Sequence, residues 1–223
     1  MYERELLWHW NGDGALLSLG ADPECNKRVL ELARLFPAVS FSGNILGSTQ
    51  TVTTDQAAGG VLAAHHFLEL GYRNFAWFET PHDPSGDRIG EMRGAAFRQT
   101  VETAGYNCAV LERLGSDAAD RKQRTICRQR LLAQLLELPK PLALFAFDDP
   151  HAVDAIEMCL DAGLRVPEDV AVLGVGNLEL ACECSMVPIS SVEYDLRAIG
   201  YAGACLLEQV MAGNPAPDPM PPF

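Results

Sequence analysis

Two adjacent carboxylates are the first side chains in this sequence with the chemistry to bind a ligand. Asp148 and Asp149 directly follow the apolar run 142–147 (LALFAF) and precede Pro150. Successive side chains of an extended segment diverge, so the pair is a poor general acid and base. Proline suits the first turn of a helix. We predict that one aspartate caps this helix and that the other accepts hydrogen bonds from ligand hydroxyls; the alternative is two caps without a ligand.

Small or polar residues also follow the other apolar runs. In an open parallel sheet, ligands bind at the carboxyl ends of the strands. The ranges expected there are 18–22, 40–44, 80–87, 148–149 and 176–177. Gly176 and Asn177 are therefore candidate ligand contacts. His82 and His151 lie at predicted strand ends, where either could line a cleft, although neither has an obvious partner.

Arg93 lies early in a predicted helix, after the polar loop 80–88. A guanidinium there could present its planar fork to adjacent sugar hydroxyls or to a carboxylate. Its position alone favours an exposed helix arginine over a ligand contact.

The sequence contains no motif of a common enzyme class. The patterns G-x-S-x-G, G-x-x-x-x-G-K-[ST] and H-E-x-x-H do not occur. Of the seven cysteines, only Cys182 and Cys184 are close in sequence, and they lack a second pair at zinc spacing. We expect reduced, mostly buried thiols, and no catalytic residue, metal or cofactor.

Short apolar runs alternate with helical segments along the chain. The runs are nearly continuous, which is typical of strands buried on both faces of a parallel sheet. They are 14–19, 38–41, 74–79, 108–112, 142–147 and 170–175. The amphipathic helical segments are 22–36, 55–70, 89–104, 117–138, 150–162 and 195–211. Glycines at 71, 105, 163 and 213 stand where left-handed helix caps are expected. The alternation predicts a doubly wound α/β architecture.

The composition excludes several classes of protein. The chain has 223 residues, and its net charge of −13 argues against binding nucleic acid by itself. A basic cluster is predicted to be a solvated helix face; its members are Arg121, Lys122, Arg124, Arg128 and Arg130. No apolar run approaches the roughly 18 residues of a membrane span. No secretory signal is visible, so we expect a soluble, cytoplasmic protein without a membrane partner.

Three longer segments form a set that is specific to one family. The first joins 52–55 (VTTD) to 66–78 (HFLELGYRNFAWF), and the second is 93–97 (RGAAF) followed by Ala104 and Gly105. The third joins 143–152 (ALFAFDDPHA) to 162–174 (AGLRVPEDVAVLG). Together they resemble the lactose-repressor and periplasmic sugar-binding fold. The segments 10–14 (WNGDG), 174–177 (GVGN) and 188–192 (PISSV) are similar to xylose-operon regulators, which carry an arabinose-regulator (AraC)-type DNA-binding domain after this domain.

The resemblance implies a type I periplasmic-binding-protein-like fold, with two doubly wound lobes, three crossing strands and a sugar in the cleft. Arg93 matches the sugar-clamping arginine of the family, and Asp149 matches the aspartate of its N-D motif. Gly176 and Asn177 match a polar pair at the end of the last strand. The sequence departs from the family at three positions, because Gly176 replaces an aspartate, Asp148 an asparagine and Ala96 a glycine. The effector therefore need not be xylose.

The resemblance also predicts the lobes. The first comprises 1–72 and 192–212, the second comprises 73–191, and a proline-rich tail covers 213–223. The first β-α-β unit of the family has no counterpart before Met1, so we expect an incomplete first lobe. The DNA-binding domain has no counterpart within the chain either.

We predict a sugar-sensing effector-binding domain of a bacterial transcription regulator, without enzymatic activity. Its expected partners are a pentose or related sugar, a second copy in a homodimer, and DNA only through a domain outside this chain. The alternatives are a periplasmic sugar-binding transport receptor and an enzyme on a similar α/β scaffold. No nucleophile–base arrangement supports the enzyme.

Overall fold

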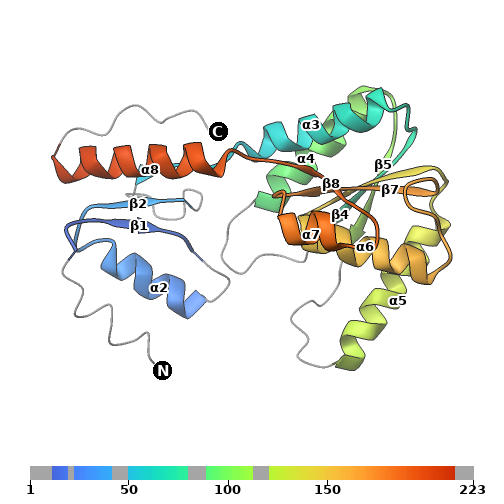
Figure 1. Ribbon diagram of the computed structural model, residues 1–223, viewed down its shortest axis with the longest axis horizontal. Helices are drawn as coiled ribbons and strands as arrows, with labels where there is room; N and C mark the ends of the chain where they lie inside the picture. Colours follow the sequence, from blue (N-terminus) through green and yellow to red (C-terminus); the bar gives the residue numbers. More distant parts are fainter. Residues whose placement is uncertain (1–11, 20–22, 42–49, 80–88, 113–120, 214–223) are drawn as a thin grey trace. The chain divides into compact units, whose positions relative to one another are not determined.

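The structure, a computed structural model, describes residues 12–19, 23–41, 50–79, 89–112 and 121–213. They fold into two compact units. Described residues up to Thr54 and from Asp195 onward form the first unit, and those from Asp55 to Tyr194 form the second. Figure 1 labels the helices and strands of both units. None of the described helices is long and apolar enough to cross a membrane.

The first unit contains a small parallel sheet in the order β1-β2-β3. Its strands are β1 (Ala15–Leu17), β2 (Ala38–Ser40) and β3 (Gln50–Thr51). Its helices are α2 (Pro23–Leu32) and α8 (Leu196–Met211). Helix α8 packs against β1 and β2. The packing is close at Gly203, where a Cβ atom would lie 2.5 Å from the ring of Phe41.

The second unit is built on a five-stranded parallel sheet in the order β5-β4-β6-β7-β8. The strands are β4 (Asn74–Glu79), β5 (Cys108–Glu112), β6 (Leu142–Ala146), β7 (Val170–Val175) and β8 (Ser190–Val192). The helices are α3 (Gln56–Glu69), α4 (Ile89–Thr103), α5 (Arg121–Glu137), α6 (Asp149–Asp161) and α7 (Glu179–Cys184).

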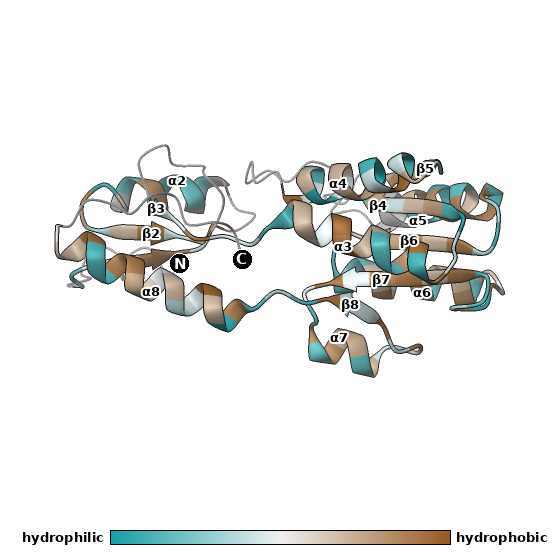
Figure 2. Ribbon diagram, turned by 90° about the horizontal axis from the view of Figure 1, so that it is seen from above, coloured by the Kyte–Doolittle hydropathy of each residue, from teal (hydrophilic) through white to brown (hydrophobic). Residues whose placement is uncertain are grey.

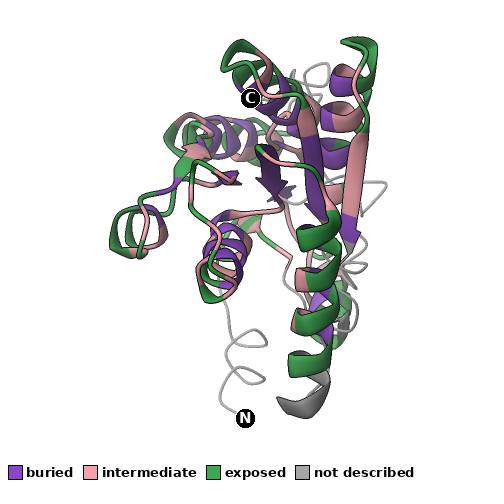
Figure 3. Cartoon of the chain, turned by 90° about the vertical axis from the view of Figure 1, so that its right-hand side faces the viewer, coloured by how far each residue is buried: buried purple, intermediate pink, exposed green. Residues whose placement is uncertain are grey.

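The sheet of the second unit has a hydrophobic core on each face. Phe75, Trp77 and Phe145 pack with residues of α3 and α4 on one face. Ala76 and Leu144 belong to the opposite face, where residues of α5 and α6 cover them. Strands β6 and β7 are mainly apolar in Figure 2. Figure 3 shows buried residues on the strands and on one side of the helices. Burial on both faces explains the nearly continuous apolar runs and confirms the predicted α/β architecture.

Helix α3 belongs to the second unit, although the predicted lobe boundary at residue 72 placed it in the first. Its packing explains the difference. A Cβ atom at Gly60 of α3 would lie 2.2 Å from the carbonyl oxygen of Arg93 in α4. The two backbones therefore approach closely, and Phe67 of α3 stacks edge-on against Phe97 of α4 at 6.4 Å between ring centroids.

The helix ends agree with the prediction from glycine positions. Gly71, Gly105, Gly163 and Gly213 all have φ angles between 69° and 89°, in the left-handed region. The predicted cap at Ser116 or Asp117 lies outside the described residues. Three short elements were not predicted, namely β3, α7 and β8. Strand β8 reads Ser-Ser-Val, which lacks an apolar run.

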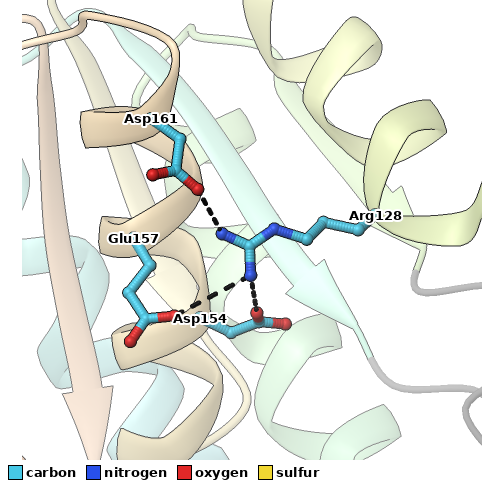
Figure 4. A network of polar contacts seen from close by, with 4 residues as sticks. All are labelled: Arg128, Asp154, Glu157 and Asp161. Atoms are coloured by element: carbon cyan, nitrogen blue, oxygen red, sulfur yellow. Dashed lines mark hydrogen bonds and ion pairs between the residues drawn. The ribbon is translucent and has the colours of Figure 1, made fainter. Parts of the chain in front are cut away.

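Arg128 of α5 is not merely a solvated cation. Its guanidinium contacts three carboxylates of α6, as Figure 4 shows. The shortest distances are 2.9 Å to Asp161, 3.3 Å to Asp154 and 3.8 Å to Glu157. These carboxylates repel one another, and the arginine offsets part of this repulsion. The side chains of Arg121, Lys122 and Arg124, which belong to the same predicted basic cluster, lie outside the part of the chain that the structure describes.

We expect the substitution Arg128→Met to lower the free energy of unfolding by about 1 kcal/mol at low salt. The arginine is 37% exposed, so salt screens the network and the difference should shrink in 1 M salt. Urea unfolding at both salt concentrations measures the effect. Arg130→Met is the matched control, because Arg130 is exposed on the same helix and has no ion pair among the described residues. Equal losses for both variants would contradict the network.

Candidate functional site

Asp148 lies just beyond the carboxyl end of strand β6 and caps the N-terminus of helix α6. The carboxylate accepts a hydrogen bond from the backbone N–H of His151 at 2.9 Å, and His151 Nδ1 lies 2.5 Å from the same oxygen. Pro150 occupies the first turn, as predicted. The imidazole of His151 packs edge-on against the rings of Phe78 and Phe147. The predicted candidate His151 is therefore held at this edge as a partner of Asp148.

Burial by itself would raise the pKa of Asp148. The hydrogen bonds and charge of His151, together with the charge of Arg93, outweigh burial and lower the pKa overall. The carboxylate consequently stays ionised at neutral pH. Its side chain is 34% exposed, so it keeps lone pairs that solvent or a ligand can reach.

The lowered pKa of Asp148 predicts a pH dependence. A carboxyl with a lower pKa in the folded state stabilises the fold above its unfolded-state pKa of about 3.9, and this contribution disappears as the pH falls through the folded-state value. Asp148→Asn keeps a good helix cap but cannot titrate. We expect the variant to lose less stability than the parent between pH 5 and the lowest accessible pH. Urea unfolding at successive pH values measures this, and parallel curves would contradict the assignment.

Asp149 is fully buried, and both of its oxygens are engaged by the protein. Oδ2 accepts a hydrogen bond from the backbone N–H of Leu178 at 2.7 Å, and Oδ1 accepts one from the hydroxyl of Ser191 at 2.6 Å. The thiol of Cys182, whose pKa burial raises, also interacts with this carboxylate. We predicted a contact between Asp149 and a ligand. In the structure the carboxylate has two strong internal donors and no solvent exposure, and its contact with a ligand stays a prediction.

The turn after β7 is fastened to its surroundings by its backbone. Gly176 and Asn177 both lie in the left-handed region, with φ of 116° and 49°. The N–H of Gly176 donates to the carbonyl of Val192 at 2.9 Å, and the N–H of Asn177 donates to the hydroxyl of Ser191 at 3.0 Å. An aspartate at position 176 would be strained at this φ, so glycine changes the backbone of the site as well as its chemistry. The side chain of Asn177 is exposed.

Arg93 is almost completely buried, with 5% of its surface exposed. Its Nε and Nη2 donate to Oε1 of Gln56 at 3.0 and 2.5 Å, and its Nη1 donates to the carbonyl oxygen of Phe147. The guanidinium also lies over the rings of Phe147 and Tyr194, at 5.6 and 6.0 Å from their centroids. The expectation of an exposed helix arginine, drawn from position alone, is therefore wrong.

The buried charge of Arg93 is held by neutral groups. Burial lowers the pKa of Arg93, and Tyr194, Asp148 and Asp149 act in the opposite direction. Arginine nevertheless stays protonated at neutral pH. None of the ion pairs among the described residues includes Arg93. Buried charges are usually paired with an opposite charge, so an arginine without one is a candidate for binding an external group.

The structure brings Arg93, Asp148 and His151 into one region, linked by Phe147. Gln56, Ser191 and Tyr194 also contact residues of this site, although no sequence pattern indicates them. Each makes its contacts with residues far away in the sequence, so no local pattern could indicate them. His82, a predicted candidate, lies outside the described residues. Among the described residues no group of His, Cys, Asp and Glu could hold a metal ion.

Asn177 also lines a hollow of about 660 Å³ beside α7. Its other lining residues are Glu179, Cys182, Glu183, Pro188 and Ile189. Asn177 is the one predicted ligand residue among them.

A sequence model of the family described as "Periplasmic binding protein-like domain" matches residues 64–221. The chain belongs to this family. Its curated relatives are transcription regulators. The xylose operon regulatory protein of Escherichia coli (strain K12) is 29% identical over 205 residues, which are 91% of this chain and 51% of the relative. The regulator GntR of Pseudomonas aeruginosa is 30% identical over 92% of this chain and 57% of its own length. The chain thus spans about half the length of these relatives.

Solved structures of family members agree with the fold. The xylose-binding transcription activator XylR superposes with a TM-score of 0.80 at 27% identity, over 97% of this chain and 56% of that chain. A LacI transcriptional regulator from a Rhodococcus species superposes with a TM-score of 0.73 at 22% identity, over 93% of this chain and 74% of that chain. The α/β periplasmic-binding-protein-like fold predicted from the sequence is confirmed.

Proposed function

We propose that this chain is the sugar-sensing effector-binding domain of a bacterial transcription regulator. The observation that carries the proposal is Arg93, a buried guanidinium at the carboxyl edge of the sheet that only neutral oxygens hold among the described residues. Charge-assisted hydrogen bonds to sugar hydroxyls are stronger than neutral ones. The family and its regulator members support the same assignment.

Arg93, Asp148 and Asn177 are the proposed ligand contacts. Arg93 donates hydrogen bonds, the ionised carboxylate of Asp148 accepts them, and the exposed amide of Asn177 can do both. Asp149 supports the site, because it holds the turn at Leu178 in place. Gly176 leaves room where the family has an aspartate, and His151 orients Asp148. His82 remains a proposed contact from the sequence alone.

The proposal extends to the partners of the domain. A homodimer in the cytoplasm would transmit the sugar signal to DNA through a separate basic domain, of the AraC type that the sequence resemblance implies. The net charge of −13 fits a domain that does not itself contact DNA. The sugar acts by binding one conformation of the domain more tightly than another. The chain is proposed to have no enzymatic activity.

The deciding experiment measures binding of a sugar panel to this chain and to the full-length protein that contains it. Xylose, ribose, xylulose and cellobiose are suitable sugars. One relative is a xylose operon regulatory protein, and structures similar to this chain contain xylulofuranose, ribose or cellobiose. Isothermal titration calorimetry gives the affinity, and analysis of each sugar after incubation reports turnover. Binding without turnover is expected. No binding to the full-length protein would overturn the proposal for these ligands, and turnover would favour an enzyme.

A further inference from the structure

Two adjacent glycines on helix α3 allow Gln56 to reach Arg93, the arginine proposed to contact the ligand. A Cβ atom at Gly60 would lie 2.2 Å from the carbonyl oxygen of Arg93, and one at Gly59 would lie 2.2 Å from the hydroxyl of Tyr194. No real Cβ atom fits at such distances. Residues three and four positions apart share a helix face, so the glycines lie on the same side of α3 as Gln56. The close approach places Gln56 beside both partners.

The side-chain oxygen of Gln56 is the common acceptor of this cluster. It accepts hydrogen bonds from Nε and Nη2 of Arg93, at 3.0 and 2.5 Å, and from the hydroxyl of Tyr194 at 3.2 Å. Gln56 is 7% exposed and Arg93 is 5% exposed, so these bonds compete little with water. One side of the guanidinium fork is thereby fixed. The carbonyl oxygen of Phe147 fixes Nη1, and the orientation of the remaining N–H bonds follows.

The chemistry of the acceptor matters as much as its position. A glutamate at position 56 could accept the same bonds, but it would form a buried, bidentate ion pair with Arg93. Such a pair would neutralise the charge and weaken the donation of the other N–H bonds to a ligand. A glutamine holds the guanidinium without placing a negative charge in direct contact with it. A leucine of similar size would do neither.

We propose that Gln56 is a positioning residue for ligand recognition: it fixes the guanidinium of Arg93 through a neutral acceptor and so reserves the charge of the arginine for the sugar. The inference rests on the proposed function, because it assumes that Arg93 contacts the ligand. It adds a residue outside the predicted site and a reason why this position carries an amide. The hydroxyl of Tyr194 is a secondary support of the same acceptor.

The test compares Gln56→Leu and Gln56→Glu in the full-length protein, with Gln134→Leu as control. Gln134 is exposed on α5, away from the cluster. Calorimetry measures the affinity for the sugar that binds the parent most tightly. Proton–nitrogen correlation spectra follow the Nε–H signal of Arg93. The signal is assigned by its absence from the spectrum of the Arg93→Lys variant.

We expect Gln56→Leu to weaken sugar binding on the order of tenfold to a hundredfold and to shift the Nε–H signal of Arg93. Gln56→Glu should preserve a protected Nε–H signal yet weaken binding on the order of tenfold, because the arginine is then neutralised. Gln134→Leu should match the parent in both measurements. Tyr194→Phe, which keeps the ring, should weaken binding less than Gln56→Leu.

The outcomes separate this inference from the proposed function. If the parent binds sugar and Gln56→Leu binds it equally well, the positioning role is overturned and the proposed function stands. Parental affinity in Gln56→Glu would overturn the role of the neutral acceptor. If the parent binds no sugar, the proposed function fails and the recognition role falls with it. The spectra of Arg93 still decide whether Gln56 positions its guanidinium.

Discussion

Replacing Arg93 by methionine is expected to reduce the affinity for the sugar by about a hundredfold or more. One charge-assisted hydrogen bond is worth about 1.5–3 kcal/mol, and a planar fork can make two. Methionine preserves much of the apolar stem that packs near Phe147 and Tyr194 but removes every donor. Calorimetric titration of parent and variant with the same sugar measures the loss.

The stability of Arg93→Met should change much less than its affinity. The substitution removes the desolvation of a buried charge, but it also removes the Arg93 donors from Gln56 and from the carbonyl of Phe147. Arg98→Met is the control, because Arg98 lies on the same helix and its one hydrogen bond among the described residues is a 3.4 Å contact with the carbonyl of Gly94. Undiminished sugar binding by the Arg93 variant, with Arg98→Met equal to the parent, would exclude Arg93 as a ligand contact.

The sequence predicts the second unit well because its elements are long or continuously apolar. The ranges of β4, β5 and β7 agree with the predicted runs, and three glycines of this unit mark helix ends correctly. The short elements carry no such signal. Strand β8 pairs in register with β7, from Leu173 and Ser190 onward, although its own sequence is polar. Its place in the sheet comes from tertiary pairing, which overrides local preference.

The site is less predictable than the fold, since its geometry depends on pairs that are distant in sequence. Strand ends identify Asp148 and Asp149 as neighbours at the carboxyl edge, but they do not show that one side chain is half-buried and the other fully enclosed. The enclosure of Asp149 follows from contacts with Leu178 and Ser191, which come from two later segments. Similarly, Gln56 reaches Arg93 only because two helices cross at glycine.

The alanine variant of Asp149 is expected to lower the free energy of unfolding of the second unit by about 2–4 kcal/mol. The carboxylate accepts from the N–H of Leu178 and the hydroxyl of Ser191 in a site without solvent exposure, and each abandoned donor costs about 1–3 kcal/mol. The carboxylate packs directly against the backbone of Gly174, where a Cβ atom would lie 2.2 Å from its Oδ1. Urea unfolding of parent and variant measures the difference.

Asp149→Asn sharpens this prediction, because its single amide oxygen can replace only one of the two acceptors. The free energy of unfolding of Asp149→Asn should therefore lie between that of the parent and that of the alanine variant. Glu168→Gln serves as the control, since Glu168 is exposed and has no ion pair among the described residues. If Asp149 instead binds the sugar directly, the asparagine variant will lose affinity while it keeps the stability of the parent. A loss of stability in the absence of sugar identifies Asp149 as the residue that fastens the turn 176–178 to helix α6, and it leaves Arg93 and Asp148 as the proposed ligand contacts at this edge.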